Sequence, residues 1–130
     1  MPPDNAALVP VGGDVAFPED GPTSGTDITR SSKDTFILAE PGTYLVQFVV
    51  SVTEAGQLVL TLEGSELPYT VTGRNIEAAQ IVGLTMITTT EEDSELTVRN
   101  PAGNATSLTI SPSSGGAQPV SAHLVILRLA

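Results

Sequence analysis

The feature that most constrains the fold is residues 43–53, because they alternate as a strand with apolar side chains on both faces. Side chains in a strand point to opposite faces in turn. One face would carry Tyr44, Val46, Phe48, Val50 and Val52. The other would carry Leu45, Gln47, Val49 and Ser51, of which half are apolar. Such a strand must be covered on both sides, and the domain's own core supplies only one cover.

The residues before this strand predict a turn. A short strand is expected over 35–38, followed by Pro41 and Gly42. Proline presets φ at the second position of a turn, and glycine accepts the positive φ that a type II turn requires at the third. We therefore expect a type II turn here.

The rest of the chain alternates between short apolar stretches and Gly-, Pro- or Asn-containing turns. Residues 76–84 also fit two turns of helix, but Gly83 and the threonines at 88–90 favour a strand. Pro68 makes 67–72 an expected edge strand. The expected strands are 14–17, 27–29, 35–38, 43–53, 57–63, 67–72, 76–90, 95–99, 107–110 and 121–129. Short strands at steady spacing predict an all-β antiparallel sandwich or barrel.

The expected strands are of two kinds. Strands 57–63, 67–72 and 95–99 have one polar face, whereas 43–53, 76–90 and 121–129 are apolar on both. Monomers rarely expose a whole apolar sheet face, so a closed cyclic oligomer is the simplest cover. Pattern alone leaves open which face of each strand meets the partner. Taking the less aromatic face of 43–53 and odd positions elsewhere, we expect the interface to contain Leu45, Val49, Ile81, Ile87, Val125 and Leu127.

Composition excludes several functions. The net charge of −10, with only five Lys and Arg, argues against nucleic acid and anionic membranes as partners. The chain has no cysteine, which removes disulfides and thiolate chemistry. No apolar run approaches the roughly 20 residues of a spanning helix, so membrane insertion is not expected. Residues 1–10 lack the basic and apolar blocks of a signal peptide.

Candidate chemical groups are few. His123 is the only histidine, and three copies near a threefold axis could bind a metal or respond to pH. The plainer interpretation is a satisfied core or interface histidine. The acidic residues Glu91, Glu92, Asp93 and Glu95 are weak candidates for calcium, and the preferred interpretation is a solvated acidic turn. No nucleophile motif or phosphate loop is recognisable, so we expect neither an enzyme nor a cofactor.

The stretch Asp-Thr-Phe-Ile-Leu-Ala-Glu-Pro-Gly-Thr-Tyr-Leu-Val-Gln-Phe-Val-Val at 34–50 resembles complement C1q-like and tumour-necrosis-factor-like jelly rolls. More narrowly, the chain is similar to the C-terminal head of BclA-type bacterial collagen-like spore-surface glycoproteins. This narrower likeness adds the Ile-Thr-Thr-Thr at 87–90, the Leu-Thr-Val-Arg-Asn at 96–100 and the apolar ending at 121–130. It spans residues 14–130.

The resemblance implies a ten-strand jelly roll at 14–130 that forms a homotrimer. In that family the middle and last strands build the threefold interface, and the head caps a Gly-X-Y stalk and sets its register. It also implies an extracellular location at a bacterial spore or cell surface. The chain has no Gly-X-Y repeat, and the extended segment expected over 1–13 would be the junction to a stalk. The alternatives are a jelly-roll module that binds a glycan or host receptor, and a trimeric phage fibre head.

Overall fold

A computed structural model describes residues 8–111, 115–118 and 122–130. In this part the chain is built from antiparallel strands with one short 3-10 turn, so the all-β prediction is confirmed. The elements are β1 Leu8–Val9, β2 Ile28–Arg30, β3 Phe36–Leu38, β4 Gly42–Val52, β5 Gly56–Leu62, β6 Ser65–Glu66, η1 Pro68–Thr70, β7 Thr72–Arg74, β8 Ala79–Thr89, β9 Ser94–Arg99, β10 Leu108–Thr109 and β11 His123–Arg128.

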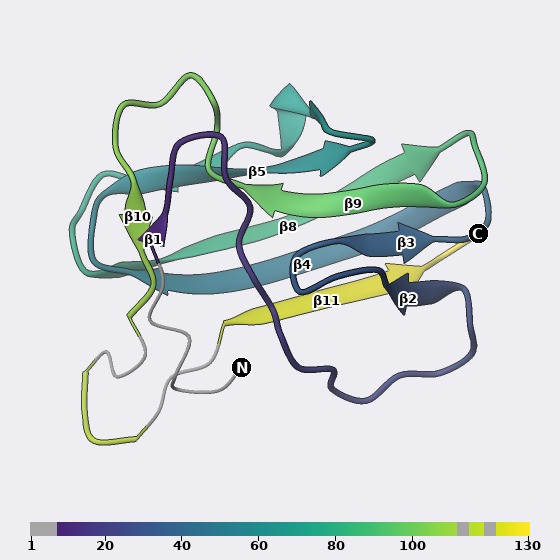
Figure 1. Cartoon of the computed structure of the whole chain (residues 1–130), viewed down its shortest axis with the longest axis horizontal. Helices are drawn as coiled ribbons and strands as arrows, with labels where there is room; N and C mark the ends of the chain where they lie inside the picture. Colours follow the sequence, from purple (N-terminus) through teal and green to yellow (C-terminus); the bar gives the residue numbers. More distant parts are fainter. Residues whose placement is uncertain (1–7, 112–114, 119–121) are drawn as a thin grey trace.

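The strands form two main sheets (Figure 1). The smaller has the order β11-β4-β8, and the larger has the order β2-β3-β9-β5-β6 with β7 also paired to β5. A separate pair joins β1 to β10. The layered, antiparallel arrangement is consistent with a β-sandwich.

The core lies between the two main sheets, and β4 provides its largest share. Its even-numbered residues from Tyr44 to Val50 are completely buried. They belong to one apolar cluster with side chains from β5 and β9, namely Leu58, Leu60, Leu96 and Val98. The alternation of β4 therefore decides which side chains face inward, as its sequence predicts.

Gly83 explains how β8 accommodates the largest side chain of β4. Gly83 lies directly opposite Phe48 in the antiparallel register. A Cβ at Gly83 would collide with the ring of Phe48. The missing side chain thus leaves room for a fully buried aromatic ring. The strand interpretation of this segment is confirmed for residues 79–89.

The predicted type II turn at Pro41–Gly42 is wrong. Gly42 does not have a positive φ, and it already belongs to β4, opposite Thr89. Glycine is needed there for a different reason, since a Cβ would collide with the backbone oxygen of Ala130. That oxygen accepts a hydrogen bond from the amide of Thr43 at 3.1 Å. The residue permits close approach of the chain's last segment.

Two predicted strands are wrong. In 67–72, Pro68 begins a 3-10 turn, because proline suits the first position of a helical turn. The strand β7 starts only at Thr72. In 14–17, Asp14 makes an isolated bridge with Arg99 and no strand follows.

The first and last strands also differ from those predicted from the sequence. The pairing of Leu8–Val9 with β10 was not predicted. It depends on a distant residue, Asn100, whose side-chain amide donates to the oxygens of Val9 and Thr106. The last strand begins at His123, and residue 121 of the predicted strand lies outside the described residues.

Candidate self-association face

The candidate site is the outer face of the β11-β4-β8 sheet, which we call the association face. Directly opposite residues of antiparallel strands lie on the same face. The register therefore places three rows of side chains across the three strands. The rows are His123–Val49–Val82, Val125–Gln47–Leu84 and Leu127–Leu45–Met86.

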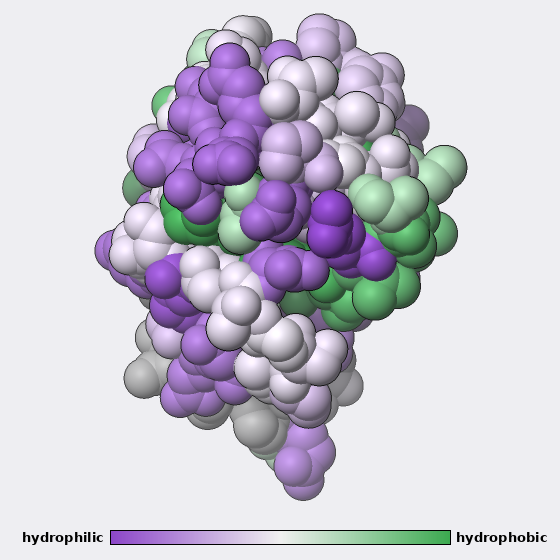
Figure 2. All heavy atoms as spheres, turned by 90° about the vertical axis from the view of Figure 1, so that its right-hand side faces the viewer, coloured by the Kyte–Doolittle hydropathy of each residue, from purple (hydrophilic) through white to green (hydrophobic). Residues whose placement is uncertain are grey.

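Most of these side chains are apolar and exposed. Leu84 is 63% exposed, Met86 56% and Leu127 54%, and Val82 and Val125 are close to half exposed. Together with Leu129 they present on the order of 500 Å² of apolar surface, near the upper end of what monomers show. Figure 2 views the molecule from the end where β8 and β11 finish, and hydrophobic side chains gather at its right-hand margin. Apolar patches of this size on a protein surface are often functional.

The association face is also nearly free of charge. The chain carries a net charge of −10. Among the described residues of the three rows, His123 is the only titratable side chain. Copies of the chain repel one another through their acidic surfaces, but this face adds no repulsion. It is the part of the described surface best suited to contact another copy.

The structure places four of the six predicted interface residues on the association face. They are Leu45, Val49, Val125 and Leu127. The assignment of Ile81 and Ile87 to this face is wrong, because they are 0% and 1% exposed and belong to the core. Odd residues of β4 pair with even residues of β8, so the outward side chains of β8 are Val82, Leu84 and Met86.

These three residues were missed because the register between β4 and β8 is a long-range property. One local signal was present. Gly83 has no side chain and therefore suits the crowded, inward side of β8, which assigns Leu84 and its even-numbered neighbours to the outside.

The free edge of β8 is partly capped by the chain itself. Two backbone oxygens of β8 accept side-chain hydrogen bonds: that of Val82 from Thr72 at 3.0 Å, and that of Met86 from Tyr69 at 3.2 Å. The ring of Tyr69 stays 65% exposed beside the association face. This edge therefore has fewer free acceptors than a bare edge strand, and it carries an exposed aromatic side chain.

The outer side of the larger sheet is very different. The predicted polar, solvated face of 57–63 is wrong for its middle part, since Val59 and Thr61 are 0% exposed. Thr61 donates to Thr97 at 2.5 Å, and Thr97 donates to Asp14 at 3.0 Å. The direction of the first bond follows because Thr97 has a single proton, which it gives to Asp14.

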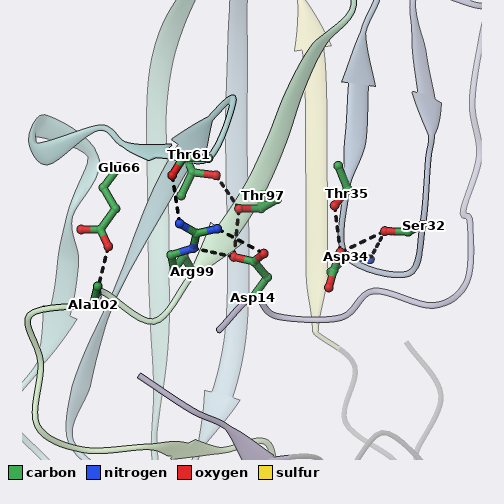
Figure 3. A network of polar contacts seen from close by, with 10 residues as sticks. Asp14, Ser32, Asp34, Thr35, Thr61, Glu66, Thr97, Arg99 and Ala102 are labelled. Carbon is green, nitrogen blue, oxygen red and sulfur yellow. Dashed lines mark hydrogen bonds and ion pairs between the residues drawn. The ribbon is translucent and has the colours of Figure 1, made fainter. Parts of the chain in front are cut away.

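Arg99 completes this polar network (Figure 3). Its Nε lies 2.8 Å from the Asp14 carboxylate, and its Nη1 donates to the oxygen of Gly64 at 3.0 Å. The hydrogen bond that Arg99 donates to the Asp14 carboxylate raises the pKa of Arg99, against the opposing effect of burial. Both charged side chains are about four-fifths buried, at 20% and 18% exposed. The network fastens the N-terminal segment over β5 and β9.

The structure does not support a metal site at the acidic turn. In the described part of the chain, no group of three or more His, Asp or Glu side chains is placed to hold a metal ion. The weak candidates Glu91, Glu92, Asp93 and Glu95 are therefore not brought together. His123 lies at one corner of the association face, exposed, opposite Val49.

An open groove of about 870 Å³ lies elsewhere on the surface. Its lining includes Gln57, Arg74, Asn75 and Asn104. Arg74 forms no ion pair with any described residue, unlike Arg30, Arg99 and Arg128. The groove therefore offers one unpaired guanidinium among side-chain amides.

The chain matches no protein-family model and no curated protein at a significant level. None of the helical segments in residues 8–111, 115–118 and 122–130 has the length and apolarity to cross a membrane.

Proposed function

We propose that this chain is a non-catalytic assembly domain that forms a homotrimer through its association face. In this proposal the fold is the ten-strand jelly roll of the complement C1q-like and tumour-necrosis-factor-like proteins. The head caps a collagen-like stalk, sets the register of its three chains and is displayed at a bacterial spore or cell surface. The stalk and the location rest on the resemblance at residues 34–50, 87–90, 96–100 and 121–130.

One observation carries the assembly part of the proposal: an apolar, nearly uncharged sheet face in a strongly acidic chain. At about 25 cal/mol per Å², covering on the order of 500 Å² yields on the order of 10 kcal/mol per copy before costs. Association costs about 4–15 kcal/mol in lost freedom. The free energy gained by burying the whole face is thus comparable to the cost of association. Burying only part of the face would gain too little.

Sedimentation equilibrium tests the assembly. We expect a particle three times the 13.4 kDa chain mass. Leu84→Asp places a charge in the middle row and should give a monomer with unchanged circular dichroism. Gln57→Asp, which adds the same charge to an exposed position of β5, is the matched control and should remain assembled. A monomeric native chain at tens of micromolar would overturn the proposal.

The stalk requires its own test. Gly-Pro-Pro repeats placed before residue 8 should form a triple helix that melts at a higher temperature with the head than without it. The same fusion carrying Leu84→Asp should lose that gain. Equal melting temperatures for all three chains would contradict the capping role.

The second candidate function is binding of an acidic glycan in the groove that contains Arg74. The unpaired guanidinium favours it, because arginine binds carboxylates through two parallel hydrogen bonds. Titration with uronic-acid and sialic-acid oligosaccharides should show saturable binding that Arg74→Gln removes. Absence of binding at millimolar ligand would reject this candidate.

A further inference from the structure

Gln47 occupies the centre of the association face. It lies in the middle row, between Val125 on β11 and Leu84 on β8. Along its own strand the neighbours on the same face are Leu45 and Val49. A single amide is thus surrounded on four sides by apolar side chains.

The other polar side chains of the face lie at its ends. Thr43 and Thr88 pair at one end of the β4–β8 ladder, and the exposed Gln80 lies at the other, opposite the buried Ser51. His123 is at a corner. Interfaces usually have an apolar centre and a polar rim. The exposed side chains of Thr88 and Gln80 fit a rim, and Gln47 is the exception.

The side-chain amide of Gln47 also lacks a hydrogen-bond partner within the described part of the chain. Its side chain makes no hydrogen bond to any other residue among 8–111, 115–118 and 122–130. Water satisfies it in the isolated chain, since it is exposed. Once another copy covers the face, an unpaired amide costs about 1–3 kcal/mol. Apolar neighbours on the same face cannot supply the missing bonds.

We propose that the symmetry axis of the assembly passes beside Gln47 and that the Gln47 amides of all copies bond to one another around it. This inference rests on the proposed self-association. A side-chain amide carries both donors and an acceptor. Each copy therefore donates an N–H to the carbonyl oxygen of the next, which closes a ring around a cyclic axis. No other polar side chain in the three rows combines a central position with both functions.

The ring gives the assembly its register. An apolar face alone allows copies to slide or to associate in other numbers. Displacing the copies leaves buried amides unpaired, just as a single buried amide selects register and copy number in coiled coils. Gln47 is therefore a specificity-determining residue that weakens association but selects one arrangement.

The test is Gln47→Glu, followed by sedimentation across pH. Carboxylates in contact cannot all ionise without a large cost. At pH 7 we expect the concentration of half-assembly to rise at least about 100-fold, because like charges at an interface repel strongly. At pH 4, where the carboxylates take up protons, assembly should return. Gln57→Glu, with the same change on β5, should assemble as the native chain does at both pH values.

His123 is the other ionisable side chain in the three rows of the association face. The Gln47→Glu series is therefore repeated with His123→Gln, and the recovery at low pH should persist. The uncharged variant Gln47→Leu should assemble more tightly but yield a mixture of copy numbers in native mass spectrometry.

Three outcomes overturn this inference while leaving self-association intact. The first is that the native chain is an oligomer and Gln47→Glu assembles equally well at pH 7. The second is that Gln47→Glu fails to assemble at pH 4 although its fold is retained. The third is that Gln47→Leu forms a single copy number. A native chain that is monomeric overturns the proposed function itself.

Discussion

On the outer side of the larger sheet, the Thr61 and Thr97 hydroxyls are buried under a network that the N-terminal segment completes. On the outer side of β11-β4-β8, Leu84 is 63% exposed and nothing in the described chain covers it. The first face is polar and closed by its own chain. The second is apolar and open. The first face contributes to folding, and the openness of the second supports the proposal that it serves association.

This comparison makes different predictions for substitutions on the two faces. Changes in the polar network should alter the free energy of unfolding at any protein concentration. Changes on the association face should alter only concentration-dependent stability, because a ligand or partner stabilises by mass action.

Replacing Asp14 should destabilise the fold most. Asp14→Ala leaves the guanidinium of Arg99 largely buried without its carboxylate and removes the acceptor of Thr97. We expect a loss of about 2–3 kcal/mol in urea unfolding. Asp14→Asn retains an acceptor and should cost less. A loss below about 0.5 kcal/mol, the range of ordinary surface changes, would mean that the network is not structural.

Gly83→Ala and Leu84→Ala together test which side of β8 faces the core. The new Cβ would enter the ring of Phe48, and overpacking of this kind costs about 1–3 kcal/mol. Leu84→Ala, one residue later on the outer side, should leave unfolding of dilute protein unchanged and weaken association. Equal unfolding losses for the two variants would contradict the assignment of inner and outer faces.

The Thr61–Thr97 pair allows a double-mutant cycle. Thr97→Val removes the acceptor of Thr61 and a donor to Asp14, for an expected cost of about 1–2 kcal/mol. Thr61→Val should cost less, since Thr97 still reaches Asp14. The double variant should cost less than the sum, because no buried hydroxyl is then left without a partner. Additive losses would argue against a directed chain of hydrogen bonds.

Glu54 should give the smallest effect, seen in the pH dependence of unfolding. Burial raises its pKa, but the amide and hydroxyl of Thr109, both at 2.7 Å, outweigh burial and hold the pKa below its usual value. A lowered folded pKa contributes stability above the unfolded pKa near 4.5, and this contribution is lost as the pH falls through the folded value. In Glu54→Gln the free energy of unfolding should therefore fall less steeply as the pH is lowered. An unchanged pH dependence would show that this contact is not maintained in solution.

Alternation within strands predicted much of this structure, because burial has a period of two whatever the strand pairs with. It predicted the all-β class and the inward face of β4. It did not predict that Ile81 faces the core, since the side of β8 depends on a register set by distant residues. Thr61 was misjudged for a similar reason. Its cover includes Asp14, far away in sequence.

Local rules failed where the chain makes long-range approaches. Pro41 and Gly42 predicted a turn type, but Gly42 is explained by the backbone of Ala130. The centre of the association face was predictable only in part. Gln47 was visible in the sequence as a polar residue on a half-apolar face, yet its position between Leu84 and Val125 required the pairing of three strands.

The hydrogen bonds from Thr72 and Tyr69 to the oxygens of β8 have a consequence for how large an assembly can grow. An incoming strand would need those same oxygens to extend the sheet sideways. With both oxygens occupied, addition of a strand at this edge is disfavoured, which is compatible with the proposed contact through the association face. Blocking strand addition at the β8 edge favours particles of finite size over fibrils, even in a protein with so much exposed apolar surface.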